Sequence, residues 1–324
     1  MQIIKKALIL IMLMISVNAF AQPYHKSEYG VVINTNDMNI DVEFYSNNIV
    51  RIVKYPVGAT FHKKSFAVVM KPVKVRFSVQ KTVNTINVTD KSLIVKINTE
   101  SGKVAFYNKS DKELLTEKQN GTHFSNCKDP LEHAFDVKQA FQLTPEEAIY
   151  GLGQHQRGTM NQRNQTLLLK QRNRQIDIPY FYSTRGYGLF WDNTSTTTFK
   201  DTTGVTYFDS TVGNGVDYYF LKSDNADQGL ARWDKLTGTA PMFPRWAFGY
   251  WQSRERYKTQ KQLLGVVKKY RSLEVPLDVI VQDWQYWGKN DEHWNSTKFV
   301  KSRYPNPQKM VDDVHKLNAH IVIS

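Results

Sequence analysis

Apolar and polar side chains alternate in short runs from Tyr24 to about Thr237. This two-residue period is that of a strand with one buried face, because successive side chains point to opposite faces of a sheet. Asn, Asp, Ser and Gly separate the runs, as turns require, and no helical period intervenes. The pattern predicts an antiparallel β-sandwich, with strands at residues 31–34, 40–44, 49–53, 73–77, 92–97, 103–107, 181–183, 187–191 and 218–221.

The pattern changes near Asp227, where a helix-compatible segment leads into residues 238–244. Pro241 and Pro244 suit neither a helix interior nor an inner strand, so this segment is predicted to be a linker or a domain boundary. We therefore expect a sandwich domain at residues 22–240 and a second domain at residues 241–324.

The second domain has the pattern of alternating strands and helices. The apolar run 244–251 predicts a strand, and a polar loop follows it. From Thr259 the apolar residues recur at helical spacing, on a face made by Leu263, Val266, Val267 and Tyr270. Pro276 closes this helix, and the continuous apolar run 277–281 predicts a strand buried on both faces.

A second helix is predicted after Asn306, because Pro307 follows a good N-cap at the first helical position. Its apolar face is Met310, Val311, Val314 and Leu317. Asn318 stops it, and a third strand begins at His320. An eight-stranded β/α barrel takes roughly 250 residues. We therefore expect the first part of a (β/α)8 TIM barrel, truncated, and the N-terminal portion of a longer protein.

Residues 1–21 have the pattern of a secretory signal. Lys5 and Lys6 precede an apolar segment, and Ala-Phe-Ala at residues 19–21 is a small-residue cleavage pattern. The apolar segment is too short to span a bilayer. The chain is therefore expected to be exported to the periplasm or the extracellular space, with no membrane span.

Composition narrows the possible partners. The formal net charge is +13, but the basic residues are scattered and accompany no nucleic-acid-binding motif, so we expect a solvated surface and no nucleic acid. Cys127 is the only cysteine, so core packing must stabilise the fold. His155, His293 and His315 lack metal-ligand spacing. We expect neither a metal nor a cofactor.

Five motifs occur in one order along the chain and resemble glycoside hydrolase family 31. They are Tyr-Gly-Leu-Gly-Gln at 150–154, Arg-Gly-Tyr-Gly-Leu-Phe-Trp-Asp at 185–192, Gly-Tyr-Trp-Gln-Ser-Arg-Glu-Arg-Tyr at 249–257, Val-Gln-Asp-Trp-Gln-Tyr-Trp at 281–287, and Tyr-Pro-Asn-Pro-Gln-Lys-Met at 304–310 with His-Lys-Leu-Asn-Ala-His-Ile at 315–321. The resemblance implies a galactose-mutarotase-like sandwich before the barrel. The third and fourth motifs look most like those of bacterial α-xylosidases, which remove α-xylosyl residues from xyloglucan side chains.

The resemblance implies a retaining hydrolysis by two aspartates, one a nucleophile and the other an acid/base. In the family both lie on later barrel strands, the nucleophile within Trp-x-Asp-x-x-Glu. That pattern is absent here, so the catalytic pair is expected beyond Ser324. Asp192, in Phe-Trp-Asp-Asn, falls in the sandwich region without the downstream Glu and is not the nucleophile.

The site residues that the resemblance implies are therefore substrate-binding ones. Asp283 matches the family aspartate that binds hydroxyls of the cleaved sugar, since a carboxylate accepts strong charge-assisted bonds. Its alternative role is to pair with an Arg or to cap a turn. Trp284 stands where family glucosidases usually carry Ile, and either walls the pocket or packs within the barrel. Glu255 stands where those glucosidases tend to carry an aromatic residue, and is otherwise a solvated charge.

Arg254 and Arg256 could pair with Glu255 or Asp283, which would keep Asp283 ionised. Gln171 and Asn173 lie in a polar loop where the family's sandwich reaches toward the barrel mouth. Trp294 and Phe299, in the loop 288–304, either offer aromatic rings to sugar faces or pack the loop's own small core.

Three functions remain open on the sequence. The first is an exported retaining α-glycosidase, and its motifs favour an α-xylosidase acting on carbohydrate of xyloglucan type. The second is an α-glucosidase of the same family. The third is a non-catalytic carbohydrate-binding protein, if the chain ends at Ser324.

Overall fold

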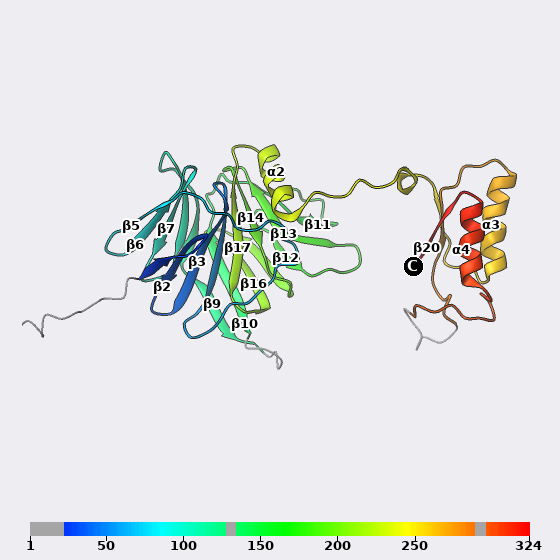
Figure 1. The fold of residues 1–324 in the computed structure, drawn as a ribbon, viewed down its shortest axis with the longest axis horizontal. Helices are drawn as coiled ribbons and strands as arrows, with labels where there is room; N and C mark the ends of the chain where they lie inside the picture. The colour runs from blue at the N-terminus through cyan, green and yellow to red at the C-terminus, as the bar shows by residue number, and fades with distance from the viewer. Residues whose placement is uncertain (1–22, 128–133, 289–295) are drawn as a thin grey trace, which may run out of the picture. The chain divides into compact units, whose positions relative to one another are not determined.

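The computed structural model describes residues 23–127, 134–288 and 296–324. The chain divides into two compact units, the first ending at Thr239 and the second running from Ala240 to Ser324 (Figure 1). The predicted signal at residues 1–21 lies outside the described residues. Within the described ranges, no helix has both the length and the apolar character needed to cross a membrane.

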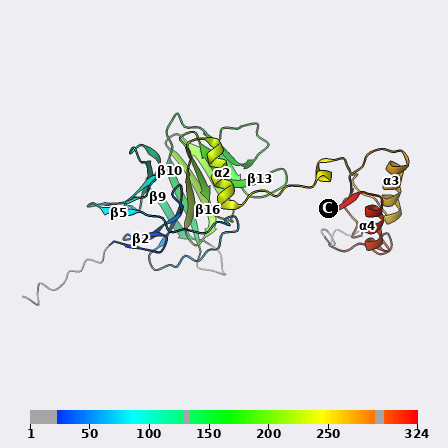
Figure 2. The same ribbon diagram turned by 45° about the horizontal axis from the view of Figure 1, so that its top comes forward.

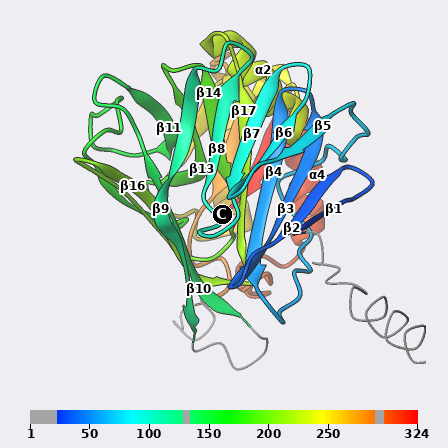
Figure 3. The same ribbon diagram turned by 90° about the vertical axis from the view of Figure 1, so that its left-hand side faces the viewer.

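The first unit is a sandwich of two antiparallel sheets, which confirms the predicted fold. One sheet has eight strands, in the spatial order β1 (Tyr24–Lys26), β2 (Gly30–Asn34), β3 (Met38–Ser46), β4 (Ile49–Pro56), β17 (Val216–Lys222), β14 (Tyr187–Trp191), β13 (Ile176–Ser183) and β11 (Ile149–Gln154). Figure 3 shows β17 between β14 and β4, so the sheet joins strands from both ends of the unit.

The other sheet has nine strands. Their spatial order is β12 (Thr166–Leu169), β15 (Thr197–Thr202), β16 (Val205–Gly213), β10 (Phe135–Gln142), β9 (Glu113–Asn126), β8 (Val104–Asn108), β7 (Leu93–Asn98), β6 (Thr85–Thr89) and β5 (Ser78–Lys81). The alternation read from the sequence sets which side chains fill the space between the sheets. On β3, for example, Ile40, Val42 and Phe44 are fully buried in that core.

A buried network of polar side chains around Lys54 lies within the first unit. The ammonium of Lys54 donates to Glu117, to the Gly102 carbonyl at 2.9 Å and to Thr122 at 3.1 Å. The Lys54 and Glu117 side chains are 0% and 1% exposed, and Tyr218 also donates to Glu117 at 2.7 Å. A buried charge needs an opposite charge and hydrogen bonds, and this network supplies both to Lys54.

The strand predicted at residues 73–77 is absent. These residues have no regular secondary structure and belong to neither sheet. The Val73 amide donates to the Phe44 carbonyl at 2.9 Å. Val75 and Phe77 still pack on the core, and the Phe77 ring stacks on Phe44 at 5.4 Å. The alternating apolar side chains therefore reflect packing on the core, although the backbone lacks the ladder of hydrogen bonds that makes a strand.

Helix α2 (Ala226–Thr237) covers part of the eight-stranded sheet (Figure 2). Asn225 caps it by accepting from the Gln228 amide at 2.9 Å. Trp233 stacks on Tyr180 at 4.4 Å and meets Phe190 edge-on at 5.1 Å. Residues 238–244, the predicted linker, contain no helix or strand.

The second unit alternates strands and helices as predicted, and makes up only part of a barrel. Its parallel sheet has the order β18 (Trp251–Gln252), β19 (Val279–Gln282) and β20 (His320–Ile323). Helices α3 (Gln260–Ser272) and α4 (Pro307–Lys316) pack on each other (Figure 1). The predicted cap of α4 is confirmed, since Asn306 accepts from the Lys309 amide at 2.9 Å. Thr259, where the helical pattern begins, caps α3 by accepting from the Gln262 amide at 3.1 Å.

The first predicted strand of this unit, residues 244–251, is mostly wrong. A 3-10 helix, η1 (Arg245–Phe248), occupies half of it, and β18 is only two residues long. The Gly249 amide closes the turn on the Trp246 carbonyl at 3.1 Å. A Cβ at Gly249 would lie 2.0 Å from the Asp278 carboxylate, which instead accepts from the Tyr250 amide at 3.0 Å. The Asp278 carboxylate, just before β19, thus takes the Tyr250 amide and interrupts the predicted strand at residues 244–251.

Candidate functional site

The loops that follow β18 and β19 leave the same edge of the second unit's sheet. The two strands are parallel, with Gln252 opposite Ile280. Their carboxyl ends therefore open side by side, which is where α/β folds bind ligands. Residues 253–259 form the first loop, and residues 283–288 and 296–306 are the described parts of the second.

A buried glutamine joins these two loops. Gln282, the last residue of β19, is 0% exposed. Its Nε2 donates to the Tyr257 carbonyl at 3.2 Å and to the Asp283 carbonyl at 2.9 Å. The hydroxyl of Tyr304 donates to the same Tyr257 carbonyl. Burial raises the pKa of Tyr304, so the phenol stays protonated and remains a donor.

Asp283 lies directly after this glutamine and is partly buried. Its Oδ1 accepts from the Trp284 amide at 2.8 Å. Among the described residues no hydrogen bond to Oδ2 is found. The carboxylate is thus oriented through one oxygen, and the other can accept from a ligand hydroxyl. Capping the turn and binding a sugar are therefore compatible roles for Asp283.

The Trp284 ring packs against the core of this unit, together with Leu263 and Ile280. The Arg256 guanidinium lies 5.1 Å from the centre of the ring, within reach of a cation–π interaction. Packing within the barrel, one of the two predicted roles of Trp284, is therefore present.

Arg256 orders the second loop. Its Nη1 donates to the Gln285 side-chain oxygen, and Arg303 donates to the Gln285 carbonyl. Gln285 has a φ of 54°, a left-handed conformation that costs energy in a residue other than glycine. The two arginine contacts compensate for that cost. The salt bridges of the described residues include none from Arg256 to Asp283, so the predicted pairing is replaced by a bond to a neutral amide.

Glu255 projects from the first loop and is exposed. No hydrogen bond or ion pair of its side chain is present within the described part of the chain. Arg254, its neighbour, lies over the Tyr257 ring at 6.0 Å instead. In this structure Glu255 has the surroundings of a solvated charge.

Gln171 and Asn173 belong to the first unit. The Gln171 amide is engaged locally: it donates to the Asp177 carbonyl at 3.0 Å and accepts from the Asp177 amide at 3.2 Å. A cavity of about 470 Å³ lies beside it, lined in part by Gln171 and Asp177. Asn173 is exposed. Gln171 thus holds the shape of its loop.

The aromatic residues predicted in the loop 288–304 divide into two cases. The Phe299 ring lies 4.8 Å from that of Tyr286 and 5.0 Å from that of Tyr304, so it packs the loop's own core. Trp294 lies outside the described residues. Within the described ranges, no three His, Cys, Asp or Glu side chains are grouped so as to hold a metal ion.

Two residues of the site, Gln282 and Gln285, were not predicted from the sequence. Gln282 and Gln285 shape the site, yet only Asp283 and Trp284 between them were singled out. The sequence signal for Gln282 is a glutamine at the end of an apolar strand. A buried side-chain amide must have hydrogen-bond partners, so such a glutamine is expected to bond to nearby loops. Asp192, set aside as a nucleophile, is buried and paired with Lys63 at 3.0 Å in the first unit.

Two family profiles match the chain. The profile of the glycosyl hydrolases family 31 TIM-barrel domain matches residues 240–324, and that of the glycosyl hydrolase 31 N-terminal galactose mutarotase-like domain matches residues 39–200.

Curated relatives cover both units. An α-xylosidase of Saccharolobus solfataricus is 35% identical over 305 residues, covering 89% of this chain and 40% of the relative. Alpha-glucosidase 2 of Bacillus thermoamyloliquefaciens is 28% identical over 298 residues, covering 87% of this chain and 36% of the relative. The chain thus spans less than half the length of either relative.

Solved structures share the fold. The family 31 α-xylosidase from a soil metagenome, complexed with xylose, has a TM-score of 0.80 and 24% identity, with 93% of this chain and 46% of that chain covered. The α-xylosidase of Xanthomonas citri has a TM-score of 0.78 and 23% identity, with 92% and 49% covered.

Proposed function

Because the chain belongs to glycoside hydrolase family 31, we propose that the protein removes α-linked xylosyl residues from a carbohydrate, with retention at the anomeric carbon. The sequence contains no Trp-x-Asp-x-x-Glu pattern. We therefore assign residues of this chain to holding the sugar, and none of them to the catalytic pair.

The observation that carries the proposal is the carboxylate of Asp283 at the carboxyl end of β19. One oxygen is fixed by the Trp284 amide at 2.8 Å, and the other has no partner among the described residues. A carboxylate held this way accepts from sugar hydroxyls without first losing a protein partner, and charge-assisted bonds of this kind are stronger than neutral ones.

Xylose, rather than glucose, is supported by the 35% identity with an α-xylosidase across most of the chain. An α-glucosidase is the second candidate, supported by the 28% identical relative that carries this name. The two sugars differ by one hydroxymethyl group on the ring, and a pocket wall that excludes this group discriminates by steric clash.

We also propose that residues 1–21 direct export and are removed before Gln22. The support is the order of positive residues, apolar segment and Ala-Phe-Ala in the sequence. Amino-terminal sequencing of the protein recovered outside the cytoplasm checks this: a mature chain that begins at Gln22 is expected, and one that retains Met1 would contradict it.

The activity is tested by comparing kcat/KM for p-nitrophenyl α-D-xyloside and p-nitrophenyl α-D-glucoside on the complete protein. The xyloside is expected to be the better substrate by at least about tenfold, since one substituent in a fitted pocket is worth about 1–3 kcal/mol. Preference for the glucoside would favour the second candidate. Binding of either sugar without turnover would favour a carbohydrate-binding protein.

A further inference from the structure

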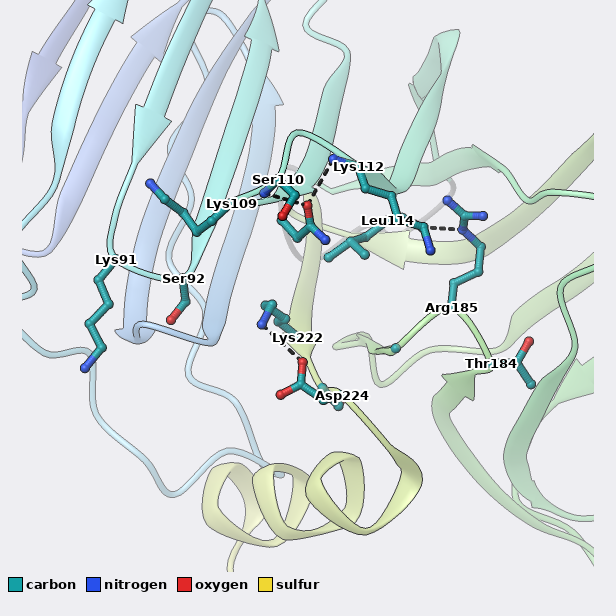
Figure 4. A pocket seen from close by; sticks show the side chains of 13 residues that line it. Lys91, Ser92, Lys109, Ser110, Lys112, Leu114, Thr184, Arg185, Lys222 and Asp224 are labelled. Atoms are coloured by element: carbon teal, nitrogen blue, oxygen red, sulfur yellow. Dashed lines mark hydrogen bonds and ion pairs between the residues drawn. The ribbon is translucent and has the colours of Figure 1, made fainter.

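A cavity of about 470 Å³ lies in the first unit, formed by the ends of strands from both sheets (Figure 4). Three turns line it, between β6 and β7, between β8 and β9 and between β13 and β14, together with the segment from β17 to α2. Its charged lining consists of Lys91, Lys109, Lys112, Arg185, Lys222 and Asp224. We call this space the basic cavity. Its volume is within the range of small-ligand sites.

The charge of the basic cavity is strongly unbalanced. Five of its lining side chains are basic, and Asp224 is the only acidic one. Of the acidic residues nearby, Asp90 accepts from the Ser92 and Leu93 amides, both at 2.7 Å, and its negative charge also acts on Lys109 and Lys222. Glu113 accepts from the Tyr107 hydroxyl at 2.7 Å. Asp111 pairs with Lys96 at 2.8 Å. The lining side chains still carry an excess of positive charge, which is available to a ligand or to solvent.

Two of the cations have no partner within the part of the chain that the structure describes. Among the described residues, the ammonium groups of Lys91 and Lys112 make no hydrogen bond or ion pair. Lys222 approaches Asp224 at a longer 3.4 Å. These cations can therefore turn toward an anion without breaking strong contacts.

Two further cations are held in place by neutral groups. The Arg185 guanidinium donates to the carbonyls of Leu114, at 3.3 Å from Nε, and of Glu113. Lys109 donates to the Asp90 carbonyl at 3.0 Å. A carbonyl orients a cation without cancelling its charge, so these contacts fix two positive groups at the wall of the cavity.

The turns that carry these residues are tightly bonded. Asn108 Oδ1 accepts from the amides of Ser110 and Lys112, both at 3.0 Å. Gly186, with a φ of 85°, accepts from the Ser223 amide at 2.8 Å. Because the backbone of these turns is already fixed by hydrogen bonds, binding there would order the lysine side chains but little of the backbone.

We propose that the basic cavity binds an oxyanion: the carboxylate or sulfate group of an acidic sugar, or free phosphate. Lys91, Lys112 and Arg185 supply positive charge to the oxyanion, and Ser92 and Ser110 supply hydroxyl groups beside it. Both sources present compact, negatively charged oxygens, which ammonium and guanidinium donors bind with charge-assisted hydrogen bonds. The proposal concerns residues of the first unit alone and does not depend on the sugar that the barrel takes.

The experiment measures binding to the full chain by titration calorimetry at low ionic strength. The probes are D-glucuronate, neutral D-glucose as its uncharged counterpart, inorganic phosphate and inorganic sulfate. At least one of the anions is expected to bind more tightly than glucose, with the affinity for the anion, and not that for glucose, falling as salt is added. Binding of glucuronate alone identifies an acidic sugar as the ligand, and binding of phosphate or sulfate alone identifies a free oxyanion.

The variant K91Q/K112Q is expected to weaken anion binding about five- to tenfold, because it removes two exposed charges from the site. The matched control K64Q/K81Q removes two exposed lysines outside the basic cavity and is expected to bind like the unaltered chain. Unfolding temperatures confirm that each variant is folded. The proposal is overturned if no anion binds at low ionic strength, or if K91Q/K112Q binds as tightly as the control.

Discussion

Gln282 donates a hydrogen bond from its side chain to the backbone carbonyl of Tyr257, 25 residues earlier, at 3.2 Å. This bond ties the loop after β18 to the end of β19. Asp283 is the next residue, and the carbonyl of Asp283 accepts from the same amide at 2.9 Å. The direction of the candidate sugar-binding carboxylate therefore depends on a neutral side chain behind it.

Replacing Gln282 by Met is expected to lower the free energy of unfolding by about 1–3 kcal/mol, because the Asp283 carbonyl loses a buried donor. It is also expected to lower kcat/KM, since Asp283 loses its support. Urea unfolding and kinetics on the two glycosides measure both effects. Gln80→Met, at an exposed glutamine of β5, is the control and is expected to change neither.

Asp283→Ala is expected to reduce kcat/KM about 100-fold or more, since two hydrogen bonds to a charged group are worth about 1.5–3 kcal/mol each. Stability is expected to change little, because the carboxylate has a single bond to the protein among the described residues, to the Trp284 amide. Asp312→Asn, on the exposed face of α4, is the control. Kinetics near those of the control would remove Asp283 from the binding site.

Much of the fold could be read from hydrophobic periodicity. β2, β3 and β4 lie where strands were predicted, α3 begins directly after Thr259 as predicted, and Asn306 is the predicted cap of α4. These features are local, because a period or a cap is set by residues a few positions apart. The prediction at residues 73–77 was wrong because alternating side chains there pack on the core while the backbone pairs with no strand. The error at residues 244–251 arose where Asp278, far along the chain, takes the Tyr250 amide.

The candidate site was predictable only in part, for the same reason. Asp283 stands at a strand end, and the sequence marks strand ends. The contacts from Gln282 to Tyr257 and from Arg256 to Gln285 join residues 25 and 29 positions apart. No local pattern encodes which amide meets which partner across two loops. The residues that orient Asp283 were therefore visible only in the folded chain.

The buried pair of Lys54 and Glu117 gives a stability prediction. Lys54→Met is expected to destabilise the protein by about 3–5 kcal/mol, because it leaves Glu117 buried without its cation. Burial already lowers the pKa of Lys54, an effect that the charge of Glu117 opposes. Replacing both residues, as K54M/E117L, is expected to recover part of the loss. Denaturant unfolding measures the series, and a single variant as stable as the parent would contradict the role of the pair.

Asp41 gives a prediction about pH. It lies on β3 and its Oδ1 is buried without a hydrogen-bond partner. Burial, and then the charge of Glu43, raise the pKa of Asp41 to about 6, while Arg51 and His25 act in the opposite direction. An unfolded aspartate titrates near 3.9. Between these values the folded chain binds more protons than the unfolded one, so stability is expected to fall as pH rises from about 4 to about 6, and then to level off.

Asp41→Asn removes this titration. It is expected to raise the free energy of unfolding by about 1 kcal/mol at neutral pH, a value reduced from the full pKa shift because solvent screens a partly exposed group. At a pH near 4 the carboxyl is protonated in the folded chain, so the gain is expected to disappear. Unfolding curves at the two pH values, with the exposed Asp37→Asn as control, measure the difference. A gain of the same size at both pH values would show that the charge of Asp41 is not its cause.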